Sequence, residues 1–158
     1  MVDFQFKSGF DKMDFKRVTE MLAESYWVTG IKIDEVIKSA ANSAILVGAF
    51  TEEGRQISYA RAISDKTRFA YVLDVFVDKD YRKMGIGQAM LKYMMDQEEM
   101  KSVYHWLLIT RDAHEVYRKI GFEVVTRPDD WMEIKKGRPA RNAAADQKTD
   151  ADLSEDLS

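Results

Sequence analysis

A strand-like segment that leads through a charged loop into two closely spaced glycines is the feature that most constrains this chain. It reads DVFVDKDYRKMGIG, spans residues 74–87 and ends with Gly85 and Gly87. Apolar residues then recur at helical spacing from Ile86, so the glycines open an amphipathic helix. A helix N-terminus presents N–H groups without intrahelical partners, and a glycine leaves no side chain between them and a ligand. This arrangement is typical of a phosphate-binding turn, although two glycines alone also fit an ordinary tight turn.

Three phosphate-binding patterns can be compared with this turn. The P-loop requires Gly-Lys-Ser/Thr, whereas Gly87 is followed by Gln88 and Ala89. The dinucleotide-binding fingerprint requires a third glycine where this chain has Met90, and an acidic residue at the end of the next strand, which is absent. The third pattern is Arg/Gln-x-x-Gly-x-Gly/Ala between a strand and a helix. The stretch from Arg82 to Gly87 fits it at every required position.

Hydrophobic periodicity predicts an α/β fold with a mixed sheet. The predicted strands are residues 3–7, 44–50, 56–63, 69–77, 103–109, 122–125 and 132–134. The second to fourth strands should form an antiparallel meander, and the last two should close the sheet. The predicted helices begin near Asp11 or Asp14, at an Asp34 cap, after Gly85, and at Ala113, the last of them ending at a left-handed C-cap on Gly121.

Length, composition and charge limit the kinds of protein that this chain can be. A chain of 158 residues with 46% hydrophobic residues suffices for one domain, which we assign to residues 1–135. Residues 136–158 are rich in Ala, Asp, Ser and Lys, so we expect a disordered tail. A net charge of -3 with interspersed signs argues against nucleic-acid binding. The N-terminus lacks a signal-peptide pattern, and no apolar run approaches the roughly 20 residues that cross a bilayer, so we expect a cytoplasmic protein without a membrane partner.

The arginine-glycine pattern resembles the pyrophosphate-binding loop of the GNAT superfamily of N-acetyltransferases. The stretch AHEVYRKIGF, residues 113–122, is similar to that family's second signature, which has an alanine, a tyrosine four residues later, a basic residue and Gly-Phe. One helix and one strand separate the two blocks, as in the family. The resemblance covers roughly residues 4–135 and is to small, single-domain, bacterial-type members. It implies a mostly antiparallel central sheet, flanked by helices and splayed into a V-shaped cofactor cleft.

The resemblance also implies acetyl-coenzyme A (acetyl-CoA) as cosubstrate, bound between strands 69–77 and 103–109. Its pantetheine arm would bond to the backbone of Val75, Phe76 and Val77, and Thr110 would bond to it from the other side. The implied pyrophosphate-binding residues are Arg82, Lys83, Met84, Gly85, Ile86, Gly87 and Gln88. Many relatives have glycine at the position of Lys83, which leaves the shape of this loop open. No metal site is predicted.

Acetyl transfer to an amine requires a neutral nitrogen, a polarised carbonyl and a proton for the departing thiolate. Because the chain has no cysteine for an acyl-enzyme, we expect direct attack within a ternary complex. The family implies Tyr117 as the proton donor, although this residue also fits a core position on its helix. Asp74 is the one charge in the apolar strand 69–77. It is either the base, the anchor of the substrate ammonium, or a structural partner of Arg61, Arg111 or His114.

Tyr26 and Trp27 follow the first helix, where family members place acceptor-binding residues. The other interpretation is that these aromatic rings simply cover the sheet. The leading hypothesis is an N-acetyltransferase acting on a primary amine of a small molecule. The alternatives are acetylation of a protein lysine or N-terminus, and an acyl-CoA-binding sensor or interaction module without turnover. Exposed edge strands favour a homodimer.

Overall fold

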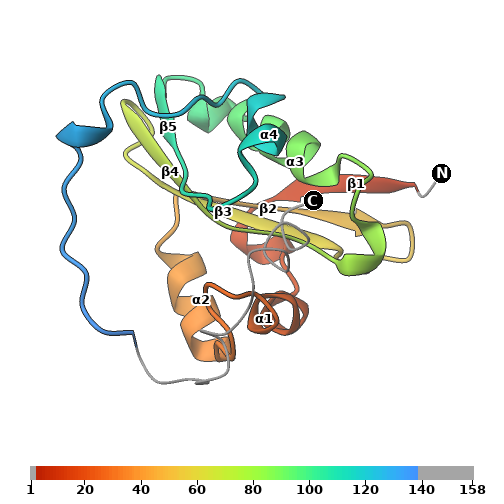
Figure 1. The fold of residues 1–158 in the computed structure, drawn as a ribbon. Coiled ribbons are helices and arrows are strands. Elements are labelled where there is room, and N and C mark those ends of the chain that lie inside the picture. Colours follow the sequence, from red (N-terminus) through yellow and green to blue (C-terminus); the bar gives the residue numbers. More distant parts are fainter. Residues whose placement is uncertain (1–2, 139–158) are drawn as a thin grey trace.

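The structure is a computed structural model, and it describes residues 3–138. It confirms the α/β class, with a five-stranded sheet in the order β1-β2-β3-β4-β5. The helices α1 and α2 cover one face of the sheet, and α3 and α4 cover the other (Figure 1). The strands are β1 (Phe4–Ser8), β2 (Ile45–Thr51), β3 (Ser58–Ser64), β4 (Phe69–Val77) and β5 (His105–Leu107). The helices are α1 (Phe15–Ala23), α2 (Ile33–Ala41), α3 (Ile86–Met95) and α4 (His114–Arg118).

Strand pairing confirms the predicted meander. The first four strands pair in chain order and antiparallel. Short turns join β2 to β3 and β3 to β4, whereas α1 and α2 lie between β1 and β2. β5 follows α3 and pairs parallel to β4, which makes the sheet mixed. The crossover through α3 places the start of that helix beside the end of β4, where the two glycines lie.

A local signal explains the start of α1 but not that of α2. The Asp14 side chain accepts from the Arg17 N–H at 3.1 Å and caps α1, as one of the two predicted aspartates should. The prediction that Asp34 caps α2 is wrong. Lys32 is the N-cap, and its carbonyl already accepts from the next turn, so Asp34 lies in the first turn, where its charge favours the helix dipole.

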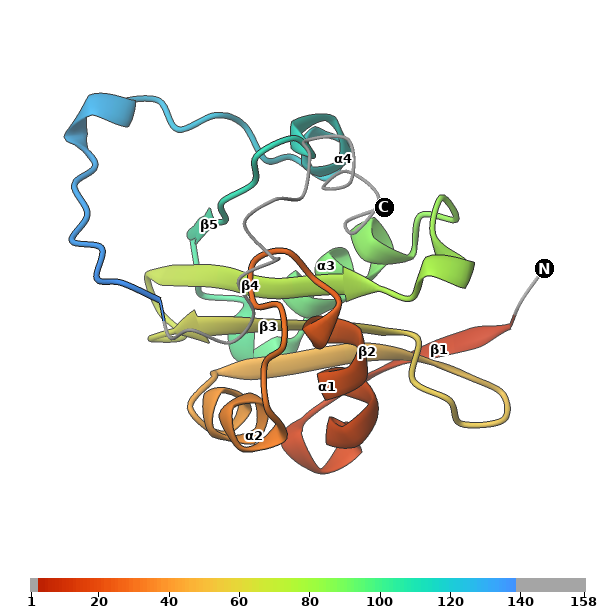
Figure 2. The ribbon, with the colours of Figure 1, turned by 60° about the horizontal axis from the view of Figure 1, so that its bottom comes forward.

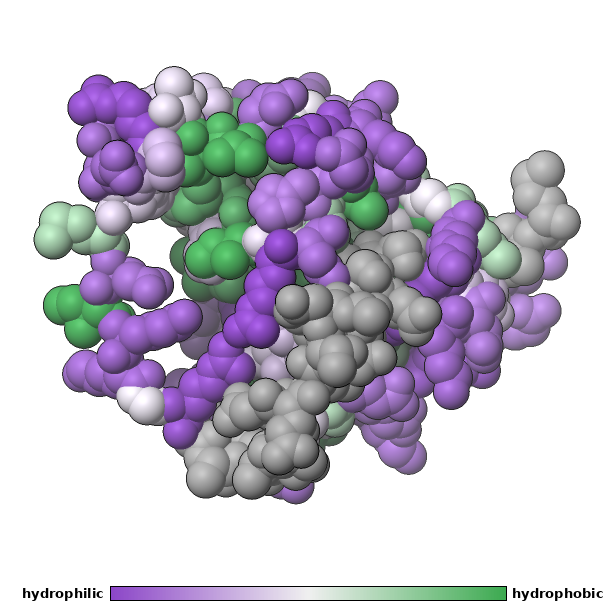
Figure 3. Space-filling model, viewed as in Figure 1, coloured by the Kyte–Doolittle hydropathy of each residue, from purple (hydrophilic) through white to green (hydrophobic). Residues whose placement is uncertain are grey.

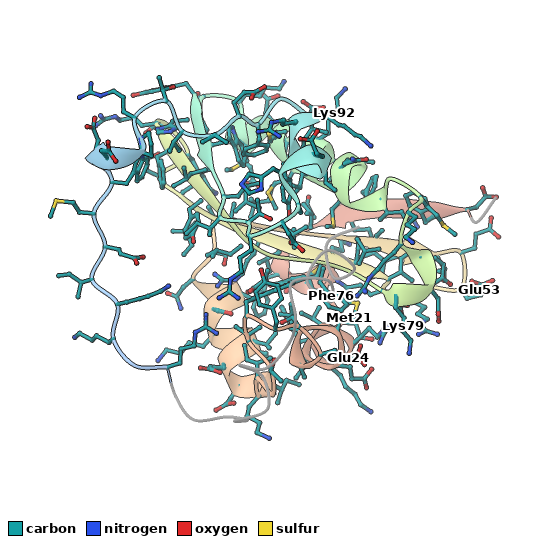
Figure 4. All side chains as sticks on the ribbon, viewed as in Figure 1. Met21, Glu24, Glu53, Phe76, Lys79 and Lys92 are labelled. Carbon is teal, nitrogen blue, oxygen red and sulfur yellow. The ribbon has the colours of Figure 1, made fainter. Side chains whose placement is uncertain are left out.

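The core lies on both faces of the central strands. On one face the apolar stripe of α1 packs with α2 against the sheet, and Met21 and Phe76 lie in this layer (Figure 4). On the other face α3 and α4 bury their stripes against β2, β3 and β4. β2 is buried along its whole length because helices cover both sides of it.

The prediction for the end of the sheet is partly wrong. β5 covers only His105–Leu107 instead of 103–109, and residues 122–125 and 132–134 form no strand. A strand needs a partner edge to hold its backbone hydrogen bonds, and here the chain leaves β5 and runs outward after residue 122. The Gly121 cap is confirmed, because Gly121 has φ +100° and the N–H groups of Gly121 and Phe122 close the Schellman bonds to Arg118 and Tyr117.

Two further sequence predictions concern the C-terminal tail and membrane-spanning segments. Most of the expected tail, residues 139–158, lies outside the described residues. Within residues 3–138, every helix is too short or too polar to span a bilayer.

Candidate active site

The sheet opens between β4 and β5. The two strands pair only from Phe69 to Tyr71, opposite His105 to Leu107. Figure 2 shows the chain beyond β5 turning away from β4. Within residues 3–138, the part of β4 after Tyr71 therefore has no neighbouring strand on this side. An open strand edge offers backbone hydrogen bonds to an extended ligand that contains amides.

A β-bulge bends β4 where the strands part. The register with β3 shifts between Tyr59 and Arg61, so β4 carries one extra residue there. Asp74 lies at this point with φ +55°, a left-handed conformation that non-glycine residues rarely adopt. Bulges increase local twist and re-aim side chains next to active sites. The bulge thus turns the Asp74 carboxylate out of the normal alternation of the strand.

The start of α3 faces the same opening. Gly85 is its N-cap residue with φ +77°, and no side chain caps the helix. The first-turn N–H groups of α3 have no partner inside the helix, which makes them donors for an anion. An added Cβ at Gly85 would meet only the Gln88 side chain, at 3.6 Å, so the space outside the turn is open. This geometry fits a diphosphate.

The Arg82 side chain braces the loop and does not extend away from it. Its Nε donates to the Val77 carbonyl at 2.9 Å, and its guanidinium lies 5.2 Å from the centre of the Phe76 ring. Of the three residues predicted to bond the pantetheine arm, Val77 therefore already uses its carbonyl as an acceptor.

Lys83 lies in the left-handed region with φ +63°. For an L-residue this conformation costs about 1–2 kcal/mol, whereas glycine adopts it without strain. We expect Lys83→Gly to raise the free energy of unfolding by about 0.5–1 kcal/mol, since the added freedom of the unfolded chain offsets part of the gain. Urea denaturation checks this, and Lys79→Gly in the preceding turn serves as a control that should only destabilise.

Two further predicted ligand residues have partners within the protein. The Gln88 side chain donates to the Val116 carbonyl at 3.2 Å and ties the start of α3 to α4. The Thr110 hydroxyl accepts from the Ala113 N–H at 3.0 Å and holds the turn into α4. The Thr110 O–H hydrogen is still able to donate, so its predicted bond to the pantetheine arm stays a prediction.

The residues predicted to bind the amine substrate lie around the bulge. Asp74 accepts from Arg61 Nε at 2.7 Å and from Trp27 Nε1 at 3.2 Å, and its side chain is 7% exposed. The Tyr26 ring packs edge-on against Trp27, with ring centres 5.0 Å apart. Arg111 lies over Tyr26, 5.3 Å from the ring centre. The structural pairing with Arg61 is thus present, and each Asp74 oxygen still has acceptor capacity.

Tyr117 is a buried phenol on α4. It is 5% exposed, and burial raises its pKa well above the ordinary value for tyrosine, with smaller contributions from the neighbouring Tyr26 and Asp112. The phenol therefore keeps its proton throughout the neutral range. Sequence reasoning missed Asp112, which lies between β5 and α4 with a buried carboxylate. Its position in TRDAH, just before the second signature, was the available signal.

Residues 42–124 match the family described as Acetyltransferase (GNAT) domain, which is about half of the chain. The chain belongs to the GNAT family. The match includes β4, the Gly85 turn and α4, which are the elements around the opening. GNAT membership supports acetyl transfer as the general class of reaction.

Solved and curated GNAT relatives agree with this placement. A protein from Xanthomonas campestris that is described as a putative acetyltransferase of the GNAT family superposes with a TM-score of 0.78 at 28% identity, covering 86% of this chain and 95% of that one. The GCN5-related N-acetyltransferase 2 of Arabidopsis thaliana is 27% identical over 121 residues, 74% of this chain and 46% of the relative. The chain thus spans about half the length of the curated relatives. An Escherichia coli GNAT enzyme solved with CoA shares the fold, with a TM-score of 0.63 at 15% identity, covering 78% of this chain and 70% of that one.

Proposed function

We propose that the protein is an acetyl-CoA-dependent N-acetyltransferase that moves an acetyl group to a primary amine by direct attack within a ternary complex. The observation that carries the proposal is the open edge of β4 leading to the uncapped start of α3. A strand edge suits the amides of a pantetheine arm, and a helix N-terminus suits a diphosphate. When bound there, the cosubstrate supplies an acetyl group that is activated as a thioester.

In this proposal the backbone does most of the cosubstrate binding. The N–H groups from Met84 to Gln88 hold the diphosphate, while the edge of β4 at Val75 and Phe76 holds the pantetheine arm. Arg82 acts indirectly, because its bonds to β4 fix the shape of the loop. Oriented backbone donors lose little entropy when a ligand binds, which favours affinity.

The acceptor amine enters beside the bulge. Asp74 anchors its ammonium group through the acceptor capacity that Arg61 and Trp27 leave unused. The ammonium releases a proton to water, and the neutral nitrogen attacks the thioester carbon. A C–N bond forms as the C–S bond breaks, and the attacking nitrogen loses a second proton to water, which leaves a neutral amide. Tyr117 donates its proton to the departing thiolate and regains one from solvent.

The anchor role of Asp74 predicts a selective effect on the amine. Asp74→Asn keeps the size of the side chain and an oxygen for Trp27, but it removes the charge that attracts the ammonium. We expect the KM for the amine to rise about 10- to 100-fold, while the Kd for coenzyme A changes less than about twofold. Initial rates and calorimetry check this. An equal rise in the KM for the amine and the Kd for coenzyme A would show that Asp74 only supports the fold.

The proposed activity is tested with a panel of amines and acetyl-CoA, following the release of free thiol. The panel should contain small primary amines and a lysine-containing peptide. The peptide tests a second candidate, because a Glycine max relative, 27% identical over 118 residues, is named a histone acetyltransferase. Thiol release with a small amine supports the leading proposal, and release with the peptide alone supports the second. Tight coenzyme binding without turnover on any amine would favour an acyl-CoA-binding module.

A further inference from the structure

Asp78 is a buried acid directly after β4, on the connection that leads to the proposed diphosphate site. We call residues 82–88 the diphosphate loop. On the right of Figure 3, where Figure 4 labels Lys79 and Glu53, the surface is mainly hydrophilic. Asp78 lies beneath this surface and is only 5% exposed. A buried carboxylate costs free energy unless it is paired and hydrogen-bonded, so the contacts of Asp78 indicate what it does.

One carboxylate oxygen of Asp78 holds the connection itself. Oδ1 accepts from the Asp80 N–H at 2.9 Å and caps the single turn Lys79–Tyr81. The backbone of Asp78 is fixed as well. Its N–H donates to the Ile57 carbonyl at 2.8 Å, and its carbonyl accepts from the Tyr81 N–H at 2.9 Å. Asp78 thus sets the path of the chain into the diphosphate loop.

The other carboxylate oxygen of Asp78 ties the connection to α1. Oδ2 accepts from Arg17 Nη2, and Arg17 Nε donates to the Gln56 carbonyl at 3.2 Å. The Arg17 side chain is 19% exposed, so solvent screens this ion pair less than a surface pair. Arg55 also contacts Oδ2, at 3.3 Å, but its side chain is 57% exposed, and such pairs contribute little. Arg17 is therefore the stronger anchor.

We propose that Asp78 and Arg17 are positioning residues for the cosubstrate, which hold the diphosphate loop in the conformation that binds the anion. This inference rests on the proposed function, because it places a diphosphate at the start of α3. The bond from Arg82 Nε to the Val77 carbonyl depends on the same connection, since Val77 and Asp78 are neighbours. Neither Asp78 nor Arg17 needs to touch the ligand.

The proposal predicts the opposite sign from simple charge attraction. By its charge alone, Asp78 repels a diphosphate, so removing that charge should tighten coenzyme binding. Through its bonds to Asp80 and Arg17, it keeps the loop in place, so removing it should weaken binding. The direction of the change in Kd therefore separates the two effects.

Asp78→Asn is the first test. The amide keeps an oxygen for the Asp80 N–H but loses the charge that holds Arg17. We expect calorimetry to show a rise of at least about tenfold in the Kd for coenzyme A. With an amine that is turned over, the KM for acetyl-CoA should rise in parallel while kcat stays within about twofold, because the lost interaction serves binding alone.

The native protein in the same titration separates two kinds of failure. If native protein does not bind coenzyme A, the proposed function fails, and this inference fails with it. If native protein binds coenzyme A and Asp78→Asn binds it equally or more tightly, this inference alone is overturned.

Arg17→Gln and Arg55→Gln form a matched pair of variants. Each removes one positive charge from the same carboxylate, but only Arg17 is largely buried. We expect the Kd for coenzyme A to rise about tenfold in Arg17→Gln and less than about twofold in Arg55→Gln. This pair tests the proposal independently of how well Asp78→Asn folds. Equal rises in both variants would show that the arginines act only by attracting the anion, which contradicts the proposal.

Val36→Ala on α2 controls for a general loss of stability. Val36 is 1% exposed and packs in the layer that α1 and α2 form against the sheet. Its truncation destabilises the fold but should leave the Kd for coenzyme A unchanged. Urea denaturation compares the stabilities of all these variants. If Val36→Ala and Asp78→Asn raise the Kd equally at equal loss of stability, Asp78 only supports the fold and the proposal is wrong.

Discussion

Gly85→Val is expected to raise the Kd for coenzyme A at least about 100-fold, equivalent to roughly 2.7 kcal/mol of binding free energy. Gly85 has φ +77° at the N-cap of α3, where a branched side chain strains the turn and stands in front of the first-turn N–H groups. Both effects act on the proposed diphosphate site. Isothermal titration calorimetry with coenzyme A measures the change.

Gly54→Val is the matched control for this substitution. Gly54 has φ +85° in the turn between β2 and β3, and an added Cβ there meets no atom within 4 Å. Glu53, labelled in Figure 4, marks the turn. The control should suffer a similar loss of stability, about 1–2 kcal/mol, and keep the coenzyme affinity of the native protein. If both variants lose affinity equally, strain alone explains the result and the diphosphate site is not at Gly85.

Tyr117→Phe is expected to lower kcat about 100-fold or more while the Kd for coenzyme A stays unchanged. Proton transfer by a positioned side chain contributes factors of this size, and phenylalanine cannot supply the proton. The ring packs against Phe122 with centres 6.0 Å apart, and phenylalanine keeps that contact. Steady-state rates and calorimetry on the same preparation separate the two constants. If the Tyr117→Phe variant kept the native kcat, Tyr117 would not be the proton donor.

The raised pKa of Tyr117 predicts how kcat depends on pH. Because burial holds the phenol protonated, no fall in kcat due to Tyr117 should occur below about pH 10. The raised pKa of Tyr117 also makes the stability of the fold depend on pH. The folded-state pKa is above the unfolded value, so the neutral phenol contributes fully to stability below pH 10, and the contribution is lost as the pH rises further. A falling limb near neutral pH that disappears in Tyr117→Phe would contradict this assignment.

The parts of the fold with strong local signals were predictable. The meander follows from apolar runs separated by short turns, and the Gly85 turn follows from glycines between a strand and an amphipathic helix. The length of β5 was not predictable, because it depends on where the chain after Leu107 turns away from β4. Residues 132–134 show the same limit, since an alternating pattern indicates strand preference but does not say which edge it pairs with.

The sequence predicted which residues belong to the candidate site. It did not predict which contacts they make. The family signatures indicated Tyr117 and the loop from Arg82, and the single charge in β4 indicated Asp74. The bulge that turns Asp74 towards Arg61 and Trp27 carries no glycine to mark it in the sequence. Asp112 was missed because its proximity to Tyr117 depends on how the chain turns between β5 and α4.

A crystal structure with coenzyme A bound is the most direct test of the account. We expect the diphosphate oxygens to lie within about 3 Å of the backbone nitrogens between Met84 and Gln88, a normal hydrogen-bond distance. The pantetheine arm should run along the edge of β4 and end beside Tyr117 and Asp74. Coenzyme bound at another surface, with the start of α3 left to solvent, would contradict the central claim.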